Sequence, residues 1–151
     1  MKIDAIKKEL SKGVKTAVRE VKEEVLAIIK ESIDYFYAGH YPHEYIRTMQ
    51  LINTIVDNGI KTRNIGAGFE IYFDSGMMAH ASKVRGKSGR WHKAEWSESK
   101  ILEVTFEDPL PHGHYTGADS NEPIWDILMY DLRDINIIIY AALIEAGVPV
   151  H

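Results

Sequence analysis

Apolar residues near the start of the chain recur at steps of three and four, the spacing of one stripe on a helix. This pattern predicts a long helix over residues 3–38, and Gly13 marks a candidate break between two helices. The other faces carry mixed charges, which leaves two interpretations. The helix lies along the edge of its own core, or it also packs against a neighbouring subunit. The stripe comprises Ile3, Ile6, Leu10, Val14, Val18, Val21, Val25, Ile28 or Ile29, Ile33 and Phe36.

A second helix is predicted over residues 43–56. The segment Gly39 to Pro42 ends the first helix, and a proline suits the first turn of the next one because its missing N–H costs nothing there. Asp57-Asn58-Gly59 then reads as a stop and turn signal.

Alternating apolar and polar positions predict two strand regions, at about 65–80 and at 101–107. In the first, Phe69, Ile71 and Phe73 share one face, and residues 77–80 begin a partner strand or a short extended piece. Gly66-Ala67-Gly68 reads as a turn leading into this strand, because dinucleotide binding needs a third glycine and a following helix.

A last helix is predicted over residues 122–146, capped by Ser120 or Asn121. Its second half, Ile137 to Ile144, is apolar nearly all round, which is typical of a helix buried on every side. In so short a chain, this pattern predicts covering by a partner subunit as well as by its own sheet. A strand over 135–141 is the alternative, because β-branched residues are dense there.

Together these elements predict one α+β domain over residues 1–151. The long N-terminal helix, the second helix and the C-terminal helix pack on a small, mostly antiparallel sheet of three to four strands. With 151 residues and 45% hydrophobic composition, the chain has the size and composition of one globular domain.

The absence of cysteine excludes disulfide scaffolds, Cys-ligated zinc, iron–sulfur clusters and thiol catalysis. The net charge of −4 argues against a whole-domain nucleic-acid binder. The longest apolar run, Ile135 to Ile144, is far shorter than the roughly 20 residues of a membrane span, and the N-terminus lacks the apolar region of a signal peptide. We therefore expect no membrane partner.

Charge is unevenly distributed along the chain. Residues 1–30 hold eight basic and five acidic side chains, a balance of +3, whereas residues 102–151 hold nine acidic side chains and Arg133, a balance of −8. Oppositely charged zones suit head-to-tail contacts between identical subunits. A random distribution of surface charge also explains the pattern.

Residues 81–100 are predicted to form a mobile basic loop, because Gly, Ser and basic residues replace the apolar period. Six basic and two acidic residues lie between positions 83 and 100. Aromatic rings among cations can anchor a protein interface or stack on nucleic-acid bases, and an inert surface loop is the third interpretation. The candidate interaction residues are Lys83, Arg85, Lys87, Arg90, Trp91 and Trp96.

Catalytic motifs are absent from the sequence: it has no Gly-x-Ser-x-Gly elbow, no P-loop and no His-Glu-x-x-His. His112, His114 and Asp119 are the nearest approach to a metal site, but their signal is weak, and a loop with hydrogen-bonding histidines is the preferred interpretation. We expect no catalysis and no cofactor.

The segment from Tyr35 to Leu51 resembles a pattern in small virion proteins of siphophages and their prophage relatives, encoded near the head–tail junction genes. In these minor virion or tail-completion and connector proteins, aromatics and Tyr-x-Pro-x-x-Tyr precede Arg-Thr and a hydrophobic Leu. His-Gly-His-Tyr and Pro-Ile-Trp-Asp later in the chain are similar too. The matching positions are Tyr41, Pro42, Tyr45, Arg47, Thr48 and Leu51.

The resemblance implies a non-enzymatic building block of a ring or tube-end layer, found in the virion and, during assembly, in the host bacterial cytoplasm. Its partners would be further copies of itself and neighbouring phage head or tail proteins. Two alternatives remain. The basic Trp-containing loop would serve a nucleic-acid-binding accessory protein, and the His/Asp cluster would serve a metal-dependent hydrolase.

Overall fold

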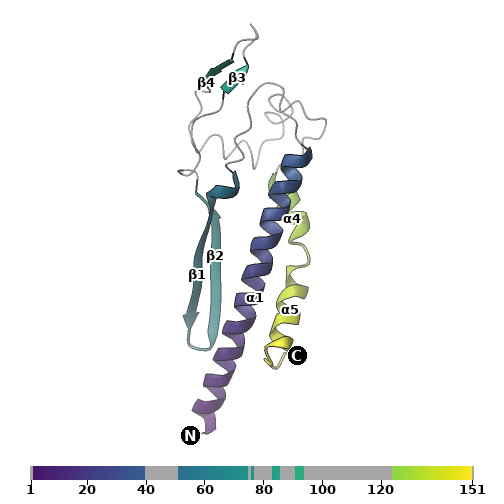
Figure 1. Cartoon of the computed structure of the whole chain (residues 1–151). Helices are drawn as coiled ribbons and strands as arrows, with labels where there is room; N and C mark the ends of the chain where they lie inside the picture. Colours follow the sequence, from purple (N-terminus) through teal and green to yellow (C-terminus); the bar gives the residue numbers. More distant parts are fainter. Residues whose placement is uncertain are drawn as a thin grey trace. The chain divides into compact units, whose positions relative to one another are not determined.

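The computed structural model describes residues 2–39, 51–74, 76, 83–85, 91–93 and 124–150. Along the chain these form α1 (Lys2–Gly39), the short 3₁₀ helix η1 (Leu51–Thr54), β1 (Ile55–Arg63), β2 (Gly66–Phe73), β3 (Lys83–Arg85), β4 (Trp91–Lys93), α4 (Ile124–Asp131) and α5 (Ile135–Glu145), as Figure 1 shows. The α+β class predicted from the sequence is confirmed.

The chain divides into two compact units. The first comprises residues 1–28, 57–71 and 132–151, and the second comprises residues 29–56 and 72–131. The first unit therefore holds most of α1, most of the β1–β2 hairpin and all of α5. The second holds the last turns of α1, η1 and α4.

Helix α1 follows the predicted stripe over 38 residues. Its buried apolar side chains recur at intervals of four and then three residues, as a helix with one covered face requires. The helix runs through Gly13 without interruption, so the predicted break there is wrong. Five predicted positions are buried, and Ala17 is buried where the prediction had Val18, which is half-buried; the five are Val21, Val25, Ile29, Ile33 and Phe36.

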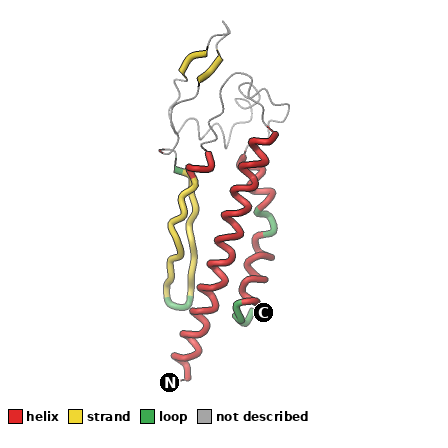
Figure 2. The backbone as a smooth tube through the Cα atoms, viewed as in Figure 1, coloured by secondary structure: helices red, strands yellow, loops and turns green. Residues whose placement is uncertain are grey.

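Strands β1 and β2 form a hairpin around a two-residue turn, drawn in yellow in Figure 2. Half-buried and exposed side chains alternate along β2, which confirms the strand and the shared face of Phe69, Ile71 and Phe73. Asn64 begins the turn at a φ of 54°, a left-handed conformation that asparagine tolerates better than most residues.

The predicted helix over 43–56 is wrong in the part that the structure describes. Residues 51–54 form the single turn η1, and β1 begins at Ile55. The stop signal at Asp57-Asn58-Gly59 lies inside β1, where Gly59 has a φ of 71° and donates its N–H to Asp57 Oδ1 at 2.7 Å. The hydrogen bond typical of a turn does form, but it lies within a strand that continues to Arg63.

Among the described residues, each sheet has two strands, β1 with β2 and β3 with β4, instead of the predicted three to four. The partner of β2 precedes it in the chain, whereas the predicted partner strand begins at residues 77–80. Those residues, and the predicted strand at 101–107, lie outside the described residues.

The predicted helix over 122–146 is two helices separated by a turn at 132–134. In this turn Ile135 donates its N–H to the Leu132 carbonyl at 3.0 Å, and Ile137 donates to the Asp134 carbonyl at 2.9 Å. These bonds span three residues, so they close tighter turns than an α-helix. Residues 135–141 are helical, and the alternative of a strand is wrong.

The second unit has the most deeply buried side chains of the described structure. Ile33 from α1 and Ile124 from α4 are fully covered, and Leu51, Ile127 and Leu128 are nearly so. Buried polar groups are hydrogen-bonded. The Ser32 hydroxyl donates to an Asp131 carboxylate oxygen at 2.7 Å, and the Thr54 hydroxyl donates to the Leu51 carbonyl at 2.7 Å. The Tyr37 hydroxyl accepts the Leu51 N–H at 3.1 Å.

Candidate self-association surface

Three contacts fix the first unit around α1. The Ser11 hydroxyl donates to the Asn64 carbonyl in the hairpin turn at 3.4 Å, and Lys22 Nζ lies 2.5 Å from Asp57 Oδ2 in β1. Gly13 meets the segment after α5: a Cβ built on it would lie 2.9 Å from Val148 Cγ2 and 3.0 Å from the Ala146 carbonyl oxygen. The glycine at position 13 therefore serves close approach of two chain segments.

The hairpin and the end of α5 contact α1 on different sides. At about 100° per residue, Ser11 and Lys22 are about 20° apart around the helix axis, and Gly13 is about 180° from Lys22. The buried stripe of α1 lies between these two directions. The chain thus covers α1 from two flanks, whereas residues 2–9 of the helix are exposed.

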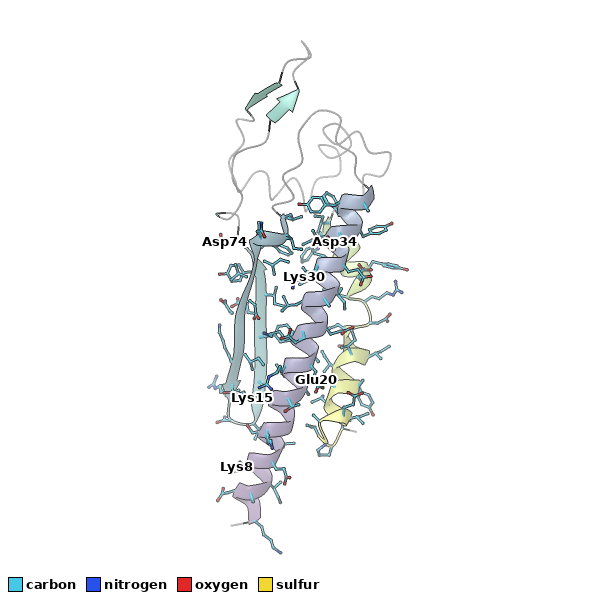
Figure 3. The ribbon with its side chains drawn as sticks, in the orientation of Figure 1. Lys8, Lys15, Glu20, Lys30, Asp34 and Asp74 are labelled. Atoms are coloured by element: carbon cyan, nitrogen blue, oxygen red, sulfur yellow. The ribbon has the colours of Figure 1, made fainter. Side chains whose placement is uncertain are left out.

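The first turns of α1 continue the apolar stripe past these contacts. Ile3 is 68% exposed and Ile6 is 64% exposed, while Leu10 is half-buried. Lysines are frequent on the other sides of the segment, and Figure 3 shows Lys8 and Lys15 among the side chains of this part of α1. Within the chain, the apolar stripe is therefore uncovered at Ile3 and Ile6 and partly covered at Leu10.

Helix α5 exposes a second apolar surface. Its inward side is marked by Ala142, which is buried. Its outward side carries four exposed residues at positions i, i+3, i+4 and i+7, with Ile137 68% exposed and Ile144 52% exposed. This spacing is that of a helix face that packs on another helix. We name this surface the α5 seam; it comprises Ile137, Tyr140, Ala141 and Ile144.

Exposure of the α5 seam corrects one prediction. The sequence predicted a helix buried on every side, but the chain itself buries only one side of α5. Covering of the helix by a partner subunit stays a prediction. Of the twelve exposed large hydrophobic residues among those described, seven lie in α4 and α5: Trp125, Met129, Tyr130, Ile137, Ile139, Tyr140 and Ile144.

A polar network orders β1 beside α1. Asp57 accepts hydrogen bonds from Lys22 and from the Gly59 N–H, and these bonds lower the pKa of the carboxyl, with the lysine as the larger cause. The hydrogen bond to Asp57 raises the pKa of Lys22. Across the hairpin, the Asn58 amide donates to Glu70 at 2.8 Å, and this bond, with Lys61 3.5 Å away, lowers the pKa of Glu70.

Removing the carboxylate of Asp57 is expected to destabilise the protein near neutral pH and to weaken the acid dependence of its stability. A carboxyl with a lowered pKa stabilises the folded state above its unfolded pKa of about 3.9, and this contribution is lost as the pH falls through the folded pKa. Urea unfolding at pH 7 and at pH 3 would show a smaller difference for Asp57→Asn than for the wild type. Asp34→Asn, at an exposed position of α1 labelled in Figure 3, is the control. An unchanged pH dependence in Asp57→Asn would contradict the expectation.

Only part of the predicted interaction loop is described. Strands β3 and β4 pair antiparallel in a register that opposes Lys83 to Lys93 and Arg85 to Trp91. The other predicted loop residues, Lys87, Arg90 and Trp96, lie outside the described residues. The structure thus brings three of the six predicted positions, 83, 85 and 91, into one short ladder.

The resemblance motif lies almost entirely outside the described residues. Leu51 is its one described member; it is buried in η1, and its backbone is held by Tyr37. The remaining motif positions are Tyr41, Pro42, Tyr45, Arg47 and Thr48.

The described residues contain no group of three or more His, Asp or Glu side chains placed to hold a metal ion. The weak metal candidates His112, His114 and Asp119 lie outside them. Within the same ranges, no helix combines the length and the apolar character that crossing a membrane requires.

Sequence reasoning missed the residues through which α1 contacts β1 and the segment after α5. Gly13 carried a signal, since a glycine inside a strong helical pattern often marks a packing contact, but it was interpreted as a break. The Lys22–Asp57 pair carried no sequence signal, because the two residues are 35 positions apart.

Comparisons with known proteins do not extend this description. No protein-family model, no curated protein and no solved structure matches the chain. The candidate site therefore rests on its own geometry and chemistry.

Proposed function

We propose that this protein is a non-enzymatic structural subunit that self-associates, of the kind that siphophages and their prophage relatives place at the head–tail junction or the tail end. The observation that carries the proposal is the α5 seam, an uncharged helix face at packing spacing that the chain leaves exposed. The resemblance of residues 35–51 to virion proteins adds the phage context. Its partners in a virion would be further copies and neighbouring head or tail proteins.

The physical case rests on the cost of exposed apolar area. Burying an exposed isoleucine contributes about 1.5–3 kcal/mol, and the α5 seam offers two isoleucines and a tyrosine within two helical turns. The seam alone is smaller than the roughly 800 Å² per partner of a stable interface. A second surface must therefore contribute, and the uncovered stripe at the start of α1 is available.

Self-association that depends on the α5 seam is the expected result. Light scattering with size-exclusion chromatography should show a mass above that of one chain that rises with concentration. Ile137→Asp with Ile144→Asp should weaken this association by roughly 100-fold or more, because two apolar side chains that the interface would bury become charged.

Tyr35→Asp is the matched control for this experiment. It also places a carboxylate at an exposed hydrophobic position, on the last turns of α1, and should leave the assembly unchanged. A wild-type protein that stays monomeric at millimolar concentration would count against self-association. Equal weakening by Tyr35→Asp would show that added charge, and not the seam, governs association.

Nucleic-acid binding through residues 83–100 is the second candidate function. The observation that favours it is the β3–β4 register, which opposes two basic positions, 83 and 93, and an Arg to a Trp. Binding of a single-stranded oligonucleotide that weakens steeply with salt, and that is lost in Lys83→Glu with Arg85→Glu, would support it.

A further inference from the structure

The start of α1 has the properties of a segment that docks on another surface. Residues 2–10 are helical and precede the chain's own flanking contacts at Ser11 and Gly13. These turns extend the rest of α1 without a new nucleation step, but their apolar side gains little packing energy within the chain. Ile3 is 68% exposed and Ile6 is 64% exposed. A surface on another molecule would cover these two side chains.

The α5 seam matches that segment in length. Ile3 and Leu10 are seven residues apart, as are Ile137 and Ile144, so each apolar face spans about 10.5 Å along its helix. Ala141 lies in the middle of the seam, where a small side chain allows another helix to approach closely. The two surfaces are complementary in size and in apolar character.

Charge selects the direction of the contact. The last turn of α5 contains no basic residue and ends in Glu145, so a carboxylate and the negative end of the helix dipole coincide there. Residues 2–10 carry three lysines against Asp4 and Glu9, a balance of +1. Lys2 and Lys7 flank the stripe of Ile3 and Ile6. Antiparallel docking with Ile3 opposite Ile144 would place Lys2, and the positive end of the α1 helix dipole, beside Glu145 of another copy.

We propose that residues 2–10 of one copy dock antiparallel on the α5 seam of a second copy, an inference that rests on the proposed function. Ile3 then lies against Ile144, and Leu10 lies against Ile137. The contact joins two different surfaces of the same chain, so each copy offers one of each. Such a contact repeats from copy to copy and closes into a ring or continues as a filament. A symmetric contact between two α5 seams would leave Ile3 and Ile6 uncovered.

Mixing two variants tests this contact directly. The first, Ile3→Asp with Ile6→Asp, lacks the docking segment and keeps the seam; the second, Ile137→Asp with Ile144→Asp, lacks the seam and keeps the segment. All four positions are exposed in the chain, and circular dichroism would verify that both variants retain their helices. Ala5→Asp, off the stripe in the same segment, is the control and should assemble as the wild type does.

The expected result is that each variant alone is monomeric and that an equimolar mixture forms a 1:1 dimer. The mixed pair keeps one intact contact, and its other two surfaces are blocked, so growth stops there. Assembly of the first variant alone at wild-type affinity would overturn the inference and leave the proposed function standing. Two monomeric variants that do not combine would also overturn it. A monomeric wild type would instead refute self-association itself.

Discussion

Ile33→Ala is expected to lower the free energy of unfolding by about 2–5 kcal/mol, the usual cost of a large cavity in a packed core. The Ile33 side chain is completely covered, and in the same unit Ile124 of α4 is completely covered too. Few described side chains are so fully enclosed, so little relaxation is available to fill the space. Urea unfolding followed by circular dichroism would measure the loss.

Tyr35→Ala provides the comparison for this prediction. It lies two residues away on the same helix, but 64% of Tyr35 is exposed, so the change in stability should stay within about 0.5 kcal/mol. A loss below about 1 kcal/mol for Ile33→Ala would mean that the core around Ile33 is much looser than the structure describes.

Gly13→Leu is expected to destabilise the protein by about 1–3 kcal/mol or more, although leucine favours helices far more than glycine does. A Cβ at this position already meets Val148 Cγ2 at 2.9 Å and the Ala146 carbonyl oxygen at 3.0 Å. The three further carbons of leucine have to displace the segment that follows α5. Thermal unfolding of the variant would show the effect as a lowered Tm.

Two further variants separate crowding from helix propensity. Gly13→Ala gains about 1 kcal/mol of helix propensity, but its Cβ crowds Val148 Cγ2 and the Ala146 carbonyl oxygen. The two effects oppose each other, so the net change in stability should be small. Val148→Ala combined with Gly13→Leu removes the nearer obstacle and should recover part of the loss, because the carbonyl oxygen of Ala146 remains in place. A stabilised Gly13→Leu protein would contradict the described approach of the two segments.

The long helix was predictable because its signal is repeated many times. Ten apolar positions at regular steps outweigh a single glycine, and the structure follows the stripe from Lys2 to Gly39. The error at Gly13 has a general cause: sequence alone does not distinguish a glycine that ends a helix from one that admits a neighbour. Only the position of Val148 makes that distinction here.

Strand β1 shows where local patterns fail. Ile55, Val56 and Ile60 continue a helical spacing from the preceding residues, and Asp57-Asn58-Gly59 has the composition of a turn. The strand forms because it pairs with β2, a tertiary interaction that outweighs local propensity. The same limit applies to α4 and α5, where a turn of three residues divides one continuous apolar pattern.

The candidate surface was predictable in part. Uniform apolar composition over Ile137 to Ile144 predicted that a partner covers this helix, and the structure adds which side is free. The stripe at Ile3 and Ile6 could not be assigned from sequence, because its exposure depends on where the hairpin and the end of α5 meet α1.

The hydrogen bonds around Asn58 also affect how this protein ages chemically. Asn-Gly is the dipeptide that deamidates most readily, since the glycine backbone nitrogen attacks the side-chain carbonyl carbon of asparagine and expels ammonia to form a cyclic imide. In the fold, the Asn58 amide is held by Glu70, and the Gly59 N–H is held by Asp57. Both reacting groups are engaged, so the imide forms mainly in molecules whose hairpin has opened. The fraction of molecules deamidated at Asn58 in a sample therefore increases with the time that the protein spends with this hairpin open.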